Sequence, residues 1–356
     1  MKFWLKKIAH RLLGHGPVSV RSFDEMYAGA AGSNGVLAIA AADACRDAPS
    51  TALLGQPAES EVLPGASLSP ERRLFSLTDA GLAGGDGVVY CPRRRIAVAE
   101  TVRLWLQPAD AHPLLAAPGF PPARPLRGRT LSLASLGAEG FYHFLIESLP
   151  RLELARPWLA GLDHVLAPGR AGGFQEKWLG LAGVPREKII WLEGHSHYRC
   201  EQLLFTGPLS YDSQPTPWLV QAIRRTVGYA PAARGPRRLW ISRRDAVARH
   251  LVWEDALLAQ LPQFERIELA GRAPAEQIAL LREAAVVAGP HGAGLANLVF
   301  CPPGAAVIEL HPGHDRPVFA RLATAAGSRH AWAVVDFTHP PENLALIAGA
   351  IRAFAA

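Results

Sequence analysis

A glycine-rich turn that contains a histidine is the part of this sequence best suited to binding an anion. The stretch AGPHGAGLANLVF, residues 288–300, follows an apolar run and leads into a segment with helical spacing. Without side chains at Gly289, Gly292 and Gly294, backbone N–H groups and the positive end of the helix can approach a phosphate closely. Asn297 takes the place of the third glycine of a dinucleotide fingerprint, and no P-loop lysine follows. The turn therefore predicts a phosphate or pyrophosphate site, with a purely structural turn as the alternative.

Further polar side chains are expected at the same edge of a sheet. His291 lies inside the turn, where an imidazole can donate to a phosphate oxygen or a base. Glu309 ends the next apolar run, where a carboxylate can accept hydrogen bonds from ribose hydroxyls. Arg243 and Arg249, in WISRRDAVAR, offer guanidinium groups that can clamp a diphosphate. Structural hydrogen bonds or salt bridges of His291 and Glu309 are the alternative interpretation.

A second group of chemically capable residues lies in GFYHFLIESLPRL, residues 140–152. His143, Glu147 and Arg151 follow one another at spacings of four, which places them on one face of a helix. A histidine and a glutamate that face the same way can act as a general base and its orienting carboxylate. An ion pair on a solvated helix surface would have the same spacing.

The elements that must position these residues alternate between short apolar runs and helical segments. Residues 87–106 suggest paired strands, and a helix is expected over about 140–159. The later apolar runs are HVLAP at 164, KIIWLEG at 188, LLFTG at 203, RLWIS at 238, ERIELA at 265, AVVAG at 285, AAVIEL at 305 and AWAVVDF at 331. We expect domains over 1–228 and 238–356, joined by a linker over 229–237 that is rich in proline, glycine and arginine. The predicted fold class is α/β, with two doubly wound, Rossmann-like domains facing a central cleft.

Composition narrows the class of protein. Of 356 residues 49% are hydrophobic, and the formal net charge is +6, which favours anionic ligands. No run of basic and aromatic residues predicts nucleic-acid binding, because the densest basic run is only PRRR at 92–95. The four cysteines form no C-x-x-C pair, which argues against a zinc knuckle or a redox dithiol and for a reducing compartment.

The N-terminal segment is basic and amphipathic. Residues 1–13 combine lysines with Trp4, Leu5, Ile8 and Leu12, and the charges within the segment interrupt any secretory apolar core. The segment fits either a surface helix packed on the body or a helix lying on an anionic membrane surface. No apolar run reaches the length of a spanning helix. We expect a cytoplasmic protein, with peripheral attachment to the inner face of the membrane as a possibility that the segment raises.

Four stretches in order, GFYHFLIESLPRL, WISRRDAVAR, AEQIALLREAAVVAGPHGAGLANLVF and PPGAAVIEL, resemble glycosyltransferase family 61. This family includes bacterial capsular polysaccharide biosynthesis proteins, and the resemblance covers about residues 135–312. It implies a two-domain GT-B fold and inverting transfer of a hexose or pentose from a nucleotide-diphosphate sugar. In many relatives the arginine motif continues to an Asn-Glu pair, whereas here Trp253 precedes Glu254, so no asparagine role is carried over.

The resemblance and the residues together assign a site. Donor-binding residues are expected to be Arg243, Arg249, Gly289, His291, Gly292, Ala293, Gly294, Asn297 and Glu309. His143 is expected to deprotonate the acceptor hydroxyl and Glu147 to orient it, with Glu147 itself as the alternative base. No D-x-D motif is present, so donor binding is expected to need no metal and no other cofactor. The acceptor is expected to be a glycan or lipid-linked glycan in capsular, exopolysaccharide or lipopolysaccharide synthesis.

Two other functions are compatible with the same residues. A metal-dependent hydrolase would use His143 and Glu147 with His291 or His311 as ligands. A non-catalytic binding subunit of a polysaccharide assembly complex would need no intact pair of His143 and Glu147.

Overall fold

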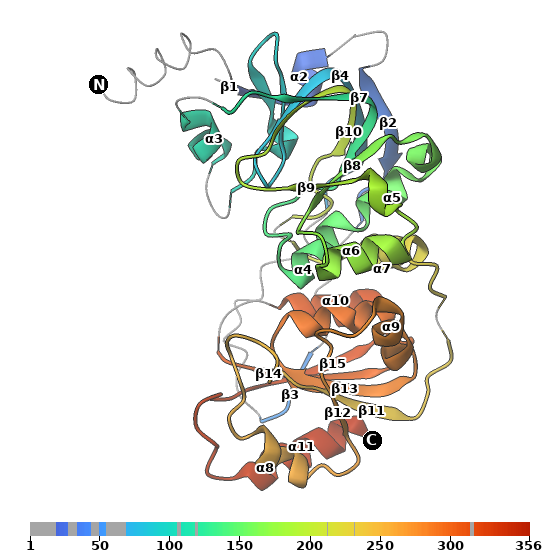
Figure 1. Ribbon diagram of the computed structural model, residues 1–356. Coiled ribbons are helices and arrows are strands. Elements are labelled where there is room, and N and C mark those ends of the chain that lie inside the picture. Colours follow the sequence, from blue (N-terminus) through green and yellow to red (C-terminus); the bar gives the residue numbers. More distant parts are fainter. Residues whose placement is uncertain are drawn as a thin grey trace, which may run out of the picture. The chain divides into compact units, whose positions relative to one another are not determined.

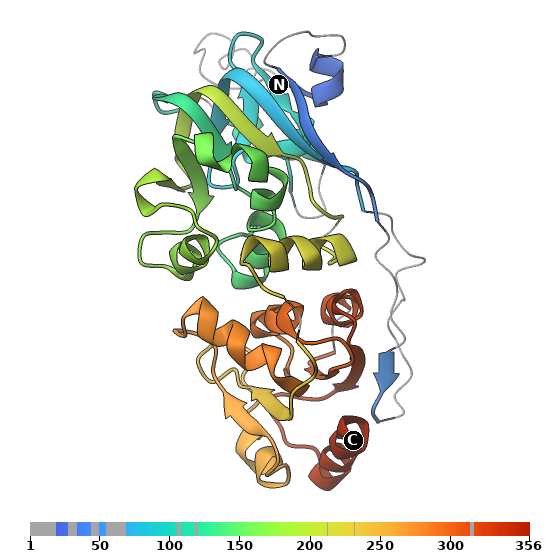
Figure 2. The ribbon, with the colours of Figure 1, turned by 90° about the vertical axis from the view of Figure 1, so that its right-hand side faces the viewer.

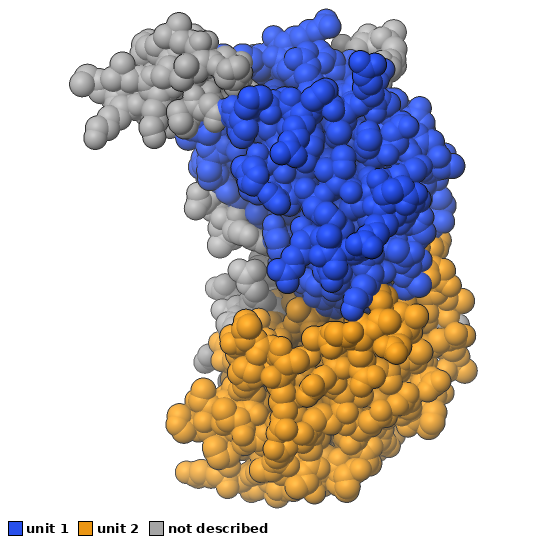
Figure 3. All heavy atoms as spheres, viewed as in Figure 1, with its two compact units in different colours: residues 1–42, 70–209 blue, residues 43–69, 210–356 orange. Residues whose placement is uncertain are grey.

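The computed structural model divides the chain into two compact units (Figure 3). Unit 1 comprises residues 1–42 and 70–209, and unit 2 comprises residues 43–69 and 210–356. The structure describes residues 19–27, 34–43, 50–54, 69–104, 108–117, 120–211, 213–230, 232–313 and 317–356. The basic segment over residues 1–13 lies outside the described residues. Among the residues that are described, no helix is both long and apolar enough to cross a membrane.

Unit 1 is built on a nine-stranded mixed sheet (Figure 1). Its strands are β1 (Ser19–Arg21), β2 (Gly35–Ala40), β4 (Arg72–Ala83), β5 (Val88–Cys91), β6 (Ile96–Val98), β7 (Arg124–Ser132), β8 (His164–Pro168), β9 (Ile189–Leu192) and β10 (His197–Thr206). The order is β1-β6-β5-β4-β10-β7-β8-β9, with β2 beside β4. Strands β10, β7, β8 and β9 are parallel, whereas β4 runs antiparallel to β2, β5 and β10.

The prediction of a doubly wound, parallel sheet in the first domain is therefore wrong for half of unit 1. Short turns join β4 to β5 and β5 to β6, and such turns leave no room for the crossover that parallel neighbours need. Gly84 and Gly87 adopt positive φ values of 81° and 73° in the first turn, and Arg95 adopts 58° in the second. The antiparallel pair β5–β6 confirms the paired strands expected over residues 87–106.

The helix expected over about 140–159 consists of several shorter pieces. α4 (Phe141–His143) continues into a π-helical turn (Phe144–Ser148), and α5 (Arg151–Leu154) leads into a 3₁₀ segment (Arg156–Gly161). Pro150 has no N–H and its ring would clash with the carbonyl four residues earlier, so a regular α-helix cannot pass through it. The other helices of unit 1 are α2 (Phe23–Tyr27), α3 (Pro113–Ala116) and α6 (Phe174–Leu181).

Unit 2 has a wholly parallel six-stranded sheet in the order β12-β11-β13-β14-β15-β3. Its strands are β11 (Arg237–Ile241), β12 (Glu265–Ile267), β13 (Ala284–Pro290), β14 (Ala306–His311), β15 (Arg329–Val334) and β3 (Ser50–Ala52). Its helices are α7 (Pro217–Thr226), α8 (Glu254–Ala259), α9 (Pro274–Arg282), the 3₁₀ helix Ala293–Phe300, α10 (Val318–Ala326) and α11 (Leu344–Ala355). Helices α9 and α10 cover one face of the sheet, and α8 and α11 cover the other (Figure 1). This is the doubly wound arrangement expected for the second domain.

The boundaries of the units differ from the expected domain boundaries in two places. Strand β3 pairs with β15, and the amide of Leu53 donates to the carbonyl of Trp332 at 2.9 Å, so this early segment completes the sheet of unit 2 (Figure 2). Helix α7 also belongs to unit 2, because Arg224 donates to the carbonyls of Val299 and Cys301. The change from unit 1 to unit 2 therefore comes before residue 210, ahead of the expected linker.

Candidate donor site and catalytic pair

The three glycines of the turn after β13 serve two different purposes. A Cβ at Gly289 would lie 2.5 Å from the carbonyl oxygen of Ile241, and one at Gly294 would lie 3.1 Å from its side chain. Gly289 therefore lets β13 approach β11 closely, and Gly294 does the same for the 3₁₀ helix Ala293–Phe300, which is a packing role. A Cβ at Gly292 would instead lie 1.6 Å from Nη1 of Arg243. The Arg243 guanidinium thus occupies the space that a side chain at 292 would fill.

The two adjacent arginines after β11, Arg243 and Arg244, have different hydrogen-bond partners. Arg244 donates to Asp255, which also binds Arg266. Arg243 donates to backbone oxygens instead, from Nη2 to Ala248 at 2.9 Å and from Nε to Arg249 at 3.3 Å. In the described part of the chain, no carboxylate oxygen lies within ion-pair distance of the Arg243 guanidinium. Within the described residues, its positive charge therefore has no acidic side chain as an ion-pair partner.

Arg243 also lies in an unusually cationic setting. Burial, and then the charge of Arg249, lower its pKa from the ordinary value for arginine, while Asp245 opposes this effect. Arg249 itself has a φ of 60°, and its carbonyl accepts the bond from Arg243. A bound anion would relieve the repulsion between the two guanidinium groups, so the pair favours a diphosphate.

Within residues 288–300, two residues are partly exposed and the others are buried. Ala293 and Gly294 are half-buried, at the start of the 3₁₀ helix Ala293–Phe300 rather than of the α-helix that the sequence suggested. Asn297 is fully buried, and its amide nitrogen donates to the carbonyl of Gly294 at 3.2 Å. Asn297 thus braces the turn from inside and does not lie where a ligand can touch it, so its expected direct role in donor binding is replaced by a supporting one.

Glu309 lies between His291, which follows β13, and His330, which lies inside β15. One oxygen bonds Nδ1 of His291, and the other bonds Nε2 of His330 at 3.2 Å. Burial alone would raise the pKa of Glu309, but the bonds from His291 and His330 outweigh it and hold the pKa at about 2. The ionised carboxylate therefore orients the His291 ring. His330 is in turn bonded to the hydroxyl of Ser50 on β3 at 2.7 Å.

Sequence reasoning missed both His330 and Ser50. His330 lies inside β15, directly before the apolar run AWAVV, and Ser50 lies 280 positions away in the chain. No local pattern connects such residues, because only the pairing of β3 with β15 brings them together.

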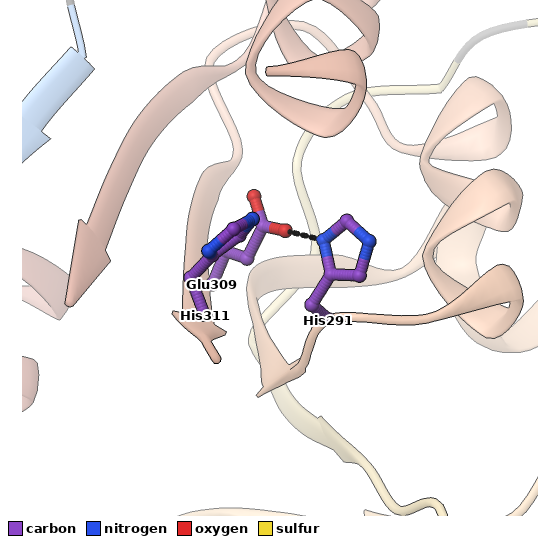
Figure 4. Close-up of side chains that lie close together, drawn as sticks. All are labelled: His291, Glu309 and His311. Atoms are coloured by element: carbon purple, nitrogen blue, oxygen red, sulfur yellow. Dashed lines mark hydrogen bonds and ion pairs between the residues drawn. The ribbon is translucent and has the colours of Figure 1, made fainter. Parts of the chain in front are cut away.

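His311 completes a compact group with His291 and Glu309 (Figure 4). One potential ligand atom from each residue lies within 4.8 Å of the others, and the rings of His291 and His311 meet edge to face at a centroid distance of 4.8 Å. Two imidazoles and a carboxylate form a ligand set that zinc and related ions accept. His143 and Glu147, the other ligands of the hydrolase alternative, belong to unit 1 rather than unit 2.

The pair His143 and Glu147 lies at the π-helical turn of unit 1. Nδ1 of His143 is 3.6 Å from a carboxylate oxygen of Glu147, as the spacing of four predicted. The alternative of an ion pair on a solvated surface is wrong, because the Glu147 side chain is only 4% exposed. His143 is 27% exposed and so stays accessible. Single π-helical turns are frequent at functional sites, which is consistent with a chemical role for this pair.

Two arginines surround Glu147, and only one was anticipated. Arg103 places Nη1 3.9 Å from the carboxylate, a contact that no sequence pattern indicated. Arg151 binds the carbonyl of Glu147 at 2.8 Å, not its carboxylate, and also donates to the carbonyl and hydroxyl of Thr206. Burial lowers the pKa of Arg151 to about 10, with Glu147 opposing the shift. Arg103 and Arg151 both line a small polar pocket whose other members include Asp86, Glu100 and Ser132.

Trp253, which precedes Glu254 where many relatives have asparagine, has a structural role in this chain. Its indole is 4% exposed within the core between α8, α11 and the sheet, and Nε1 donates to the carbonyl of Asp336 at 2.8 Å. Glu254 is buried too, accepting from the Ser242 hydroxyl at 3.1 Å and lying 3.3 Å from Nε of Arg266. Both residues therefore anchor the segment that follows β11.

Comparisons with known proteins match part of the chain to a glycosyltransferase family. Residues 141–308 match the family model described as Glycosyltransferase 61. That stretch contains every expected site residue except Glu309, which follows it directly. The chain is also similar to the EGF domain-specific O-linked N-acetylglucosamine transferase of Drosophila melanogaster, with 31% identity over 126 residues. This similarity covers 34% of the present chain, and the chain spans about a quarter (24%) of the length of that relative.

Proposed function

We propose that the protein transfers a sugar from a nucleoside-diphosphate donor to a hydroxyl group of a glycan or glycolipid, with inversion, and the match of residues 141–308 to the Glycosyltransferase 61 model supports this proposal. The observation that carries the proposal is the Arg243 guanidinium packed in the space beside Gly292, with no acidic partner among the described residues. A cation held against a backbone turn, at the carboxyl edge of a parallel sheet, is suited to a diphosphate.

On the donor side, Arg243 and the start of the helix at Ala293 would bind the diphosphate, and Arg249 would add charge. These groups supply the positive charge that a divalent ion provides in other transferases, so donor binding is proposed to need no metal. His291, oriented by Glu309, would donate to the nucleotide. Gly289, Gly294 and Asn297 would act indirectly by shaping the turn.

On the acceptor side, His143 would take the proton from the acceptor hydroxyl as its oxygen attacks the anomeric carbon. The bond from that carbon to the diphosphate breaks at the same time, and the electron pair leaves with the nucleoside diphosphate, whose charge Arg243 stabilises. Glu147, 3.6 Å from Nδ1 of His143, would stabilise the resulting imidazolium. Glu147 as the base itself remains the alternative.

The cellular role is proposed on family resemblance. A glycan or lipid-linked glycan of capsular, exopolysaccharide or lipopolysaccharide synthesis is the proposed acceptor, and a hexose or pentose the proposed donor sugar. The similar Drosophila protein is named for transfer of N-acetylglucosamine, which supports a hexose. The cytoplasm, with attachment to an anionic membrane through residues 1–13, is the proposed location.

The donor proposal is tested by thermal unfolding in EDTA with uridine, guanosine and cytidine diphosphates. One of them should raise the unfolding free energy by about 2.7 kcal/mol at one hundred times its dissociation constant. Arg243→Ala should lose this stabilisation, whereas Arg244→Ala, whose side chain pairs with Asp255, should keep it. A stabilisation that requires a divalent ion, or that survives Arg243→Ala, would contradict the proposed donor contacts.

A further inference from the structure

We propose that His291, Glu309 and His311 bind one divalent transition-metal ion, with zinc the best-matched ion. The proposal concerns a metal site and does not depend on the nucleotide assignment, although the two sites share His291 and Glu309. Three protein ligands leave the fourth position of tetrahedral zinc open to water or an anion.

Strand register brings the three residues together. β13 and β14 are parallel neighbours with Pro290 opposite Leu310, and the amide of His291 donates to the carbonyl of Leu310 at 2.7 Å. His291 therefore lies beside His311 at the ends of the two strands. Glu309 and His311 are two residues apart on β14, so they point to the same face of the sheet. Figure 4 shows the carboxylate of Glu309 beside the His311 ring and bonded to the His291 ring.

The chemistry of the group matches a metal better than a simple ion pair. One protonated histidine would be enough to neutralise Glu309. The site nevertheless contains three histidines, because His291 and His330 bond the carboxylate and the His311 ring contacts the His291 ring. Two of the three ligands are buried, since His291 is 6% and Glu309 2% exposed, and His311 is half-buried. Zinc would replace the proton of the hydrogen bond between His291 and Glu309. Imidazole ligands are preferred by zinc, copper and nickel over calcium or magnesium.

A supporting shell is already in place behind the ligands. The Glu309 oxygen that does not bond His291 bonds Nε2 of His330, and Nδ1 of His330 is bonded to the Ser50 hydroxyl. Such outer bonds orient a ligating carboxylate and strengthen metal binding. On the other side, the Phe319 ring meets His291 edge to face at a centroid distance of 5.0 Å and limits its rotation.

The test is isothermal titration of untagged, EDTA-dialysed protein with zinc chloride in the absence of nucleotide. We expect one equivalent of zinc to bind, and His311→Ala to weaken that binding by more than 100-fold, beyond the range seen when only a supporting residue is lost. His339→Ala is the matched control, because His339 is an exposed histidine of the same unit that pairs with Asp336. It should bind zinc as the unaltered protein does.

Two results would overturn the proposal. One is the absence of stoichiometric zinc binding, and the other is equal zinc affinity in His311→Ala and the unaltered protein. His311→Gln, which keeps a polar side chain of similar size, provides the same comparison if His311→Ala does not fold. Loss of nucleotide binding in EDTA would contradict the donor proposal alone, because the zinc titration contains no nucleotide.

Discussion

At the scale of single residues, Arg243 and Gly292 act as a unit. The φ of Gly292 is 170°, an extended value that any residue adopts, so glycine is needed there for space and not for conformation. A Cβ at this position would lie 1.6 Å from Nη1, 2.5 Å from Cζ and 3.0 Å from Cδ of Arg243. Any side chain at 292 must therefore displace the guanidinium from the turn.

This coupling predicts a non-additive pair of substitutions. Gly292→Ala and Arg243→Ala should each weaken nucleoside-diphosphate binding by at least about 10-fold, since a charge-assisted hydrogen bond contributes roughly 1.5–3 kcal/mol. The double variant should bind no more weakly than Arg243→Ala, as isothermal titration can measure. Gly349→Ala is the control, because a Cβ there meets only Arg352, at 3.9 Å. Losses that add would mean that Gly292 does not act through Arg243.

The second residue-scale prediction separates catalysis from donor binding. His143→Ala should leave nucleoside-diphosphate affinity nearly unchanged, because the proposed donor residues belong to unit 2 and His143 to unit 1. Transfer, or slow donor hydrolysis in its place, should fall by about 10²–10⁴-fold, the usual contribution of a positioned general base. His195→Ala, an exposed histidine of unit 1, should change neither quantity.

Glu147→Gln distinguishes the two candidates for the base. If Glu147 orients and stabilises the His143 ring, its loss should reduce transfer less than His143→Ala does. A larger reduction would make Glu147 the base. Near-normal turnover of His143→Ala would remove His143 from the mechanism.

At the scale of elements, the π-helical turn depends on Arg151. Its guanidinium bonds the carbonyl of Glu147 and both oxygens of Thr206, which ties the turn to the end of β10. Pro150 prevents a regular α-helix here. The hydrogen bonds of Arg151 therefore take the place of some backbone hydrogen bonds that a regular helix would make. The position of the Glu147 carboxylate thus depends on a residue four positions further along the chain.

Arg151→Met should therefore lower the free energy of unfolding more than the same substitution of an exposed arginine does. We expect the free energy of unfolding to fall by about 3 kcal/mol, because buried carbonyl and hydroxyl oxygens lose their donor. Arg156→Met should change it by less than about 1 kcal/mol, because Arg156 is 51% exposed and forms a surface ion pair with Glu153. Urea unfolding of the two variants makes the comparison. Equal effects would show that Arg151 does not hold the turn.

At the scale of the whole molecule, the proposed donor residues and the catalytic pair belong to different compact units. Nucleoside diphosphate should therefore slow amide hydrogen exchange in residues 289–300 of unit 2 and leave β4 and β10 of unit 1 unchanged. Exchange followed by mass spectrometry can measure both regions in one experiment. Arg243→Ala should abolish the protection. Protection confined to unit 1 would place the nucleotide elsewhere.

Much of unit 2 was determined by local sequence. Short apolar runs, separated by helical segments, predicted all five strands from β11 to β15, because strand and helix periodicity are properties of neighbouring residues. The spacing of four predicted that His143 lies beside Glu147, and the glycines predicted a tight turn after β13. Pro150 also indicates a break in the expected helix, which the spacing of four does not reveal.

Only the tertiary structure decided the rest. The antiparallel half of unit 1, the addition of β3 to unit 2 and the network from Ser50 through His330 to Glu309 all depend on strand pairing between distant segments. The availability of Arg243 was decided in the same way, because Arg244, the next residue, has Asp255 as its partner. Local periodicity sets which residues form an element, but a side chain's partner depends on how the elements pack, and contacts across 280 positions leave no periodic trace in the sequence.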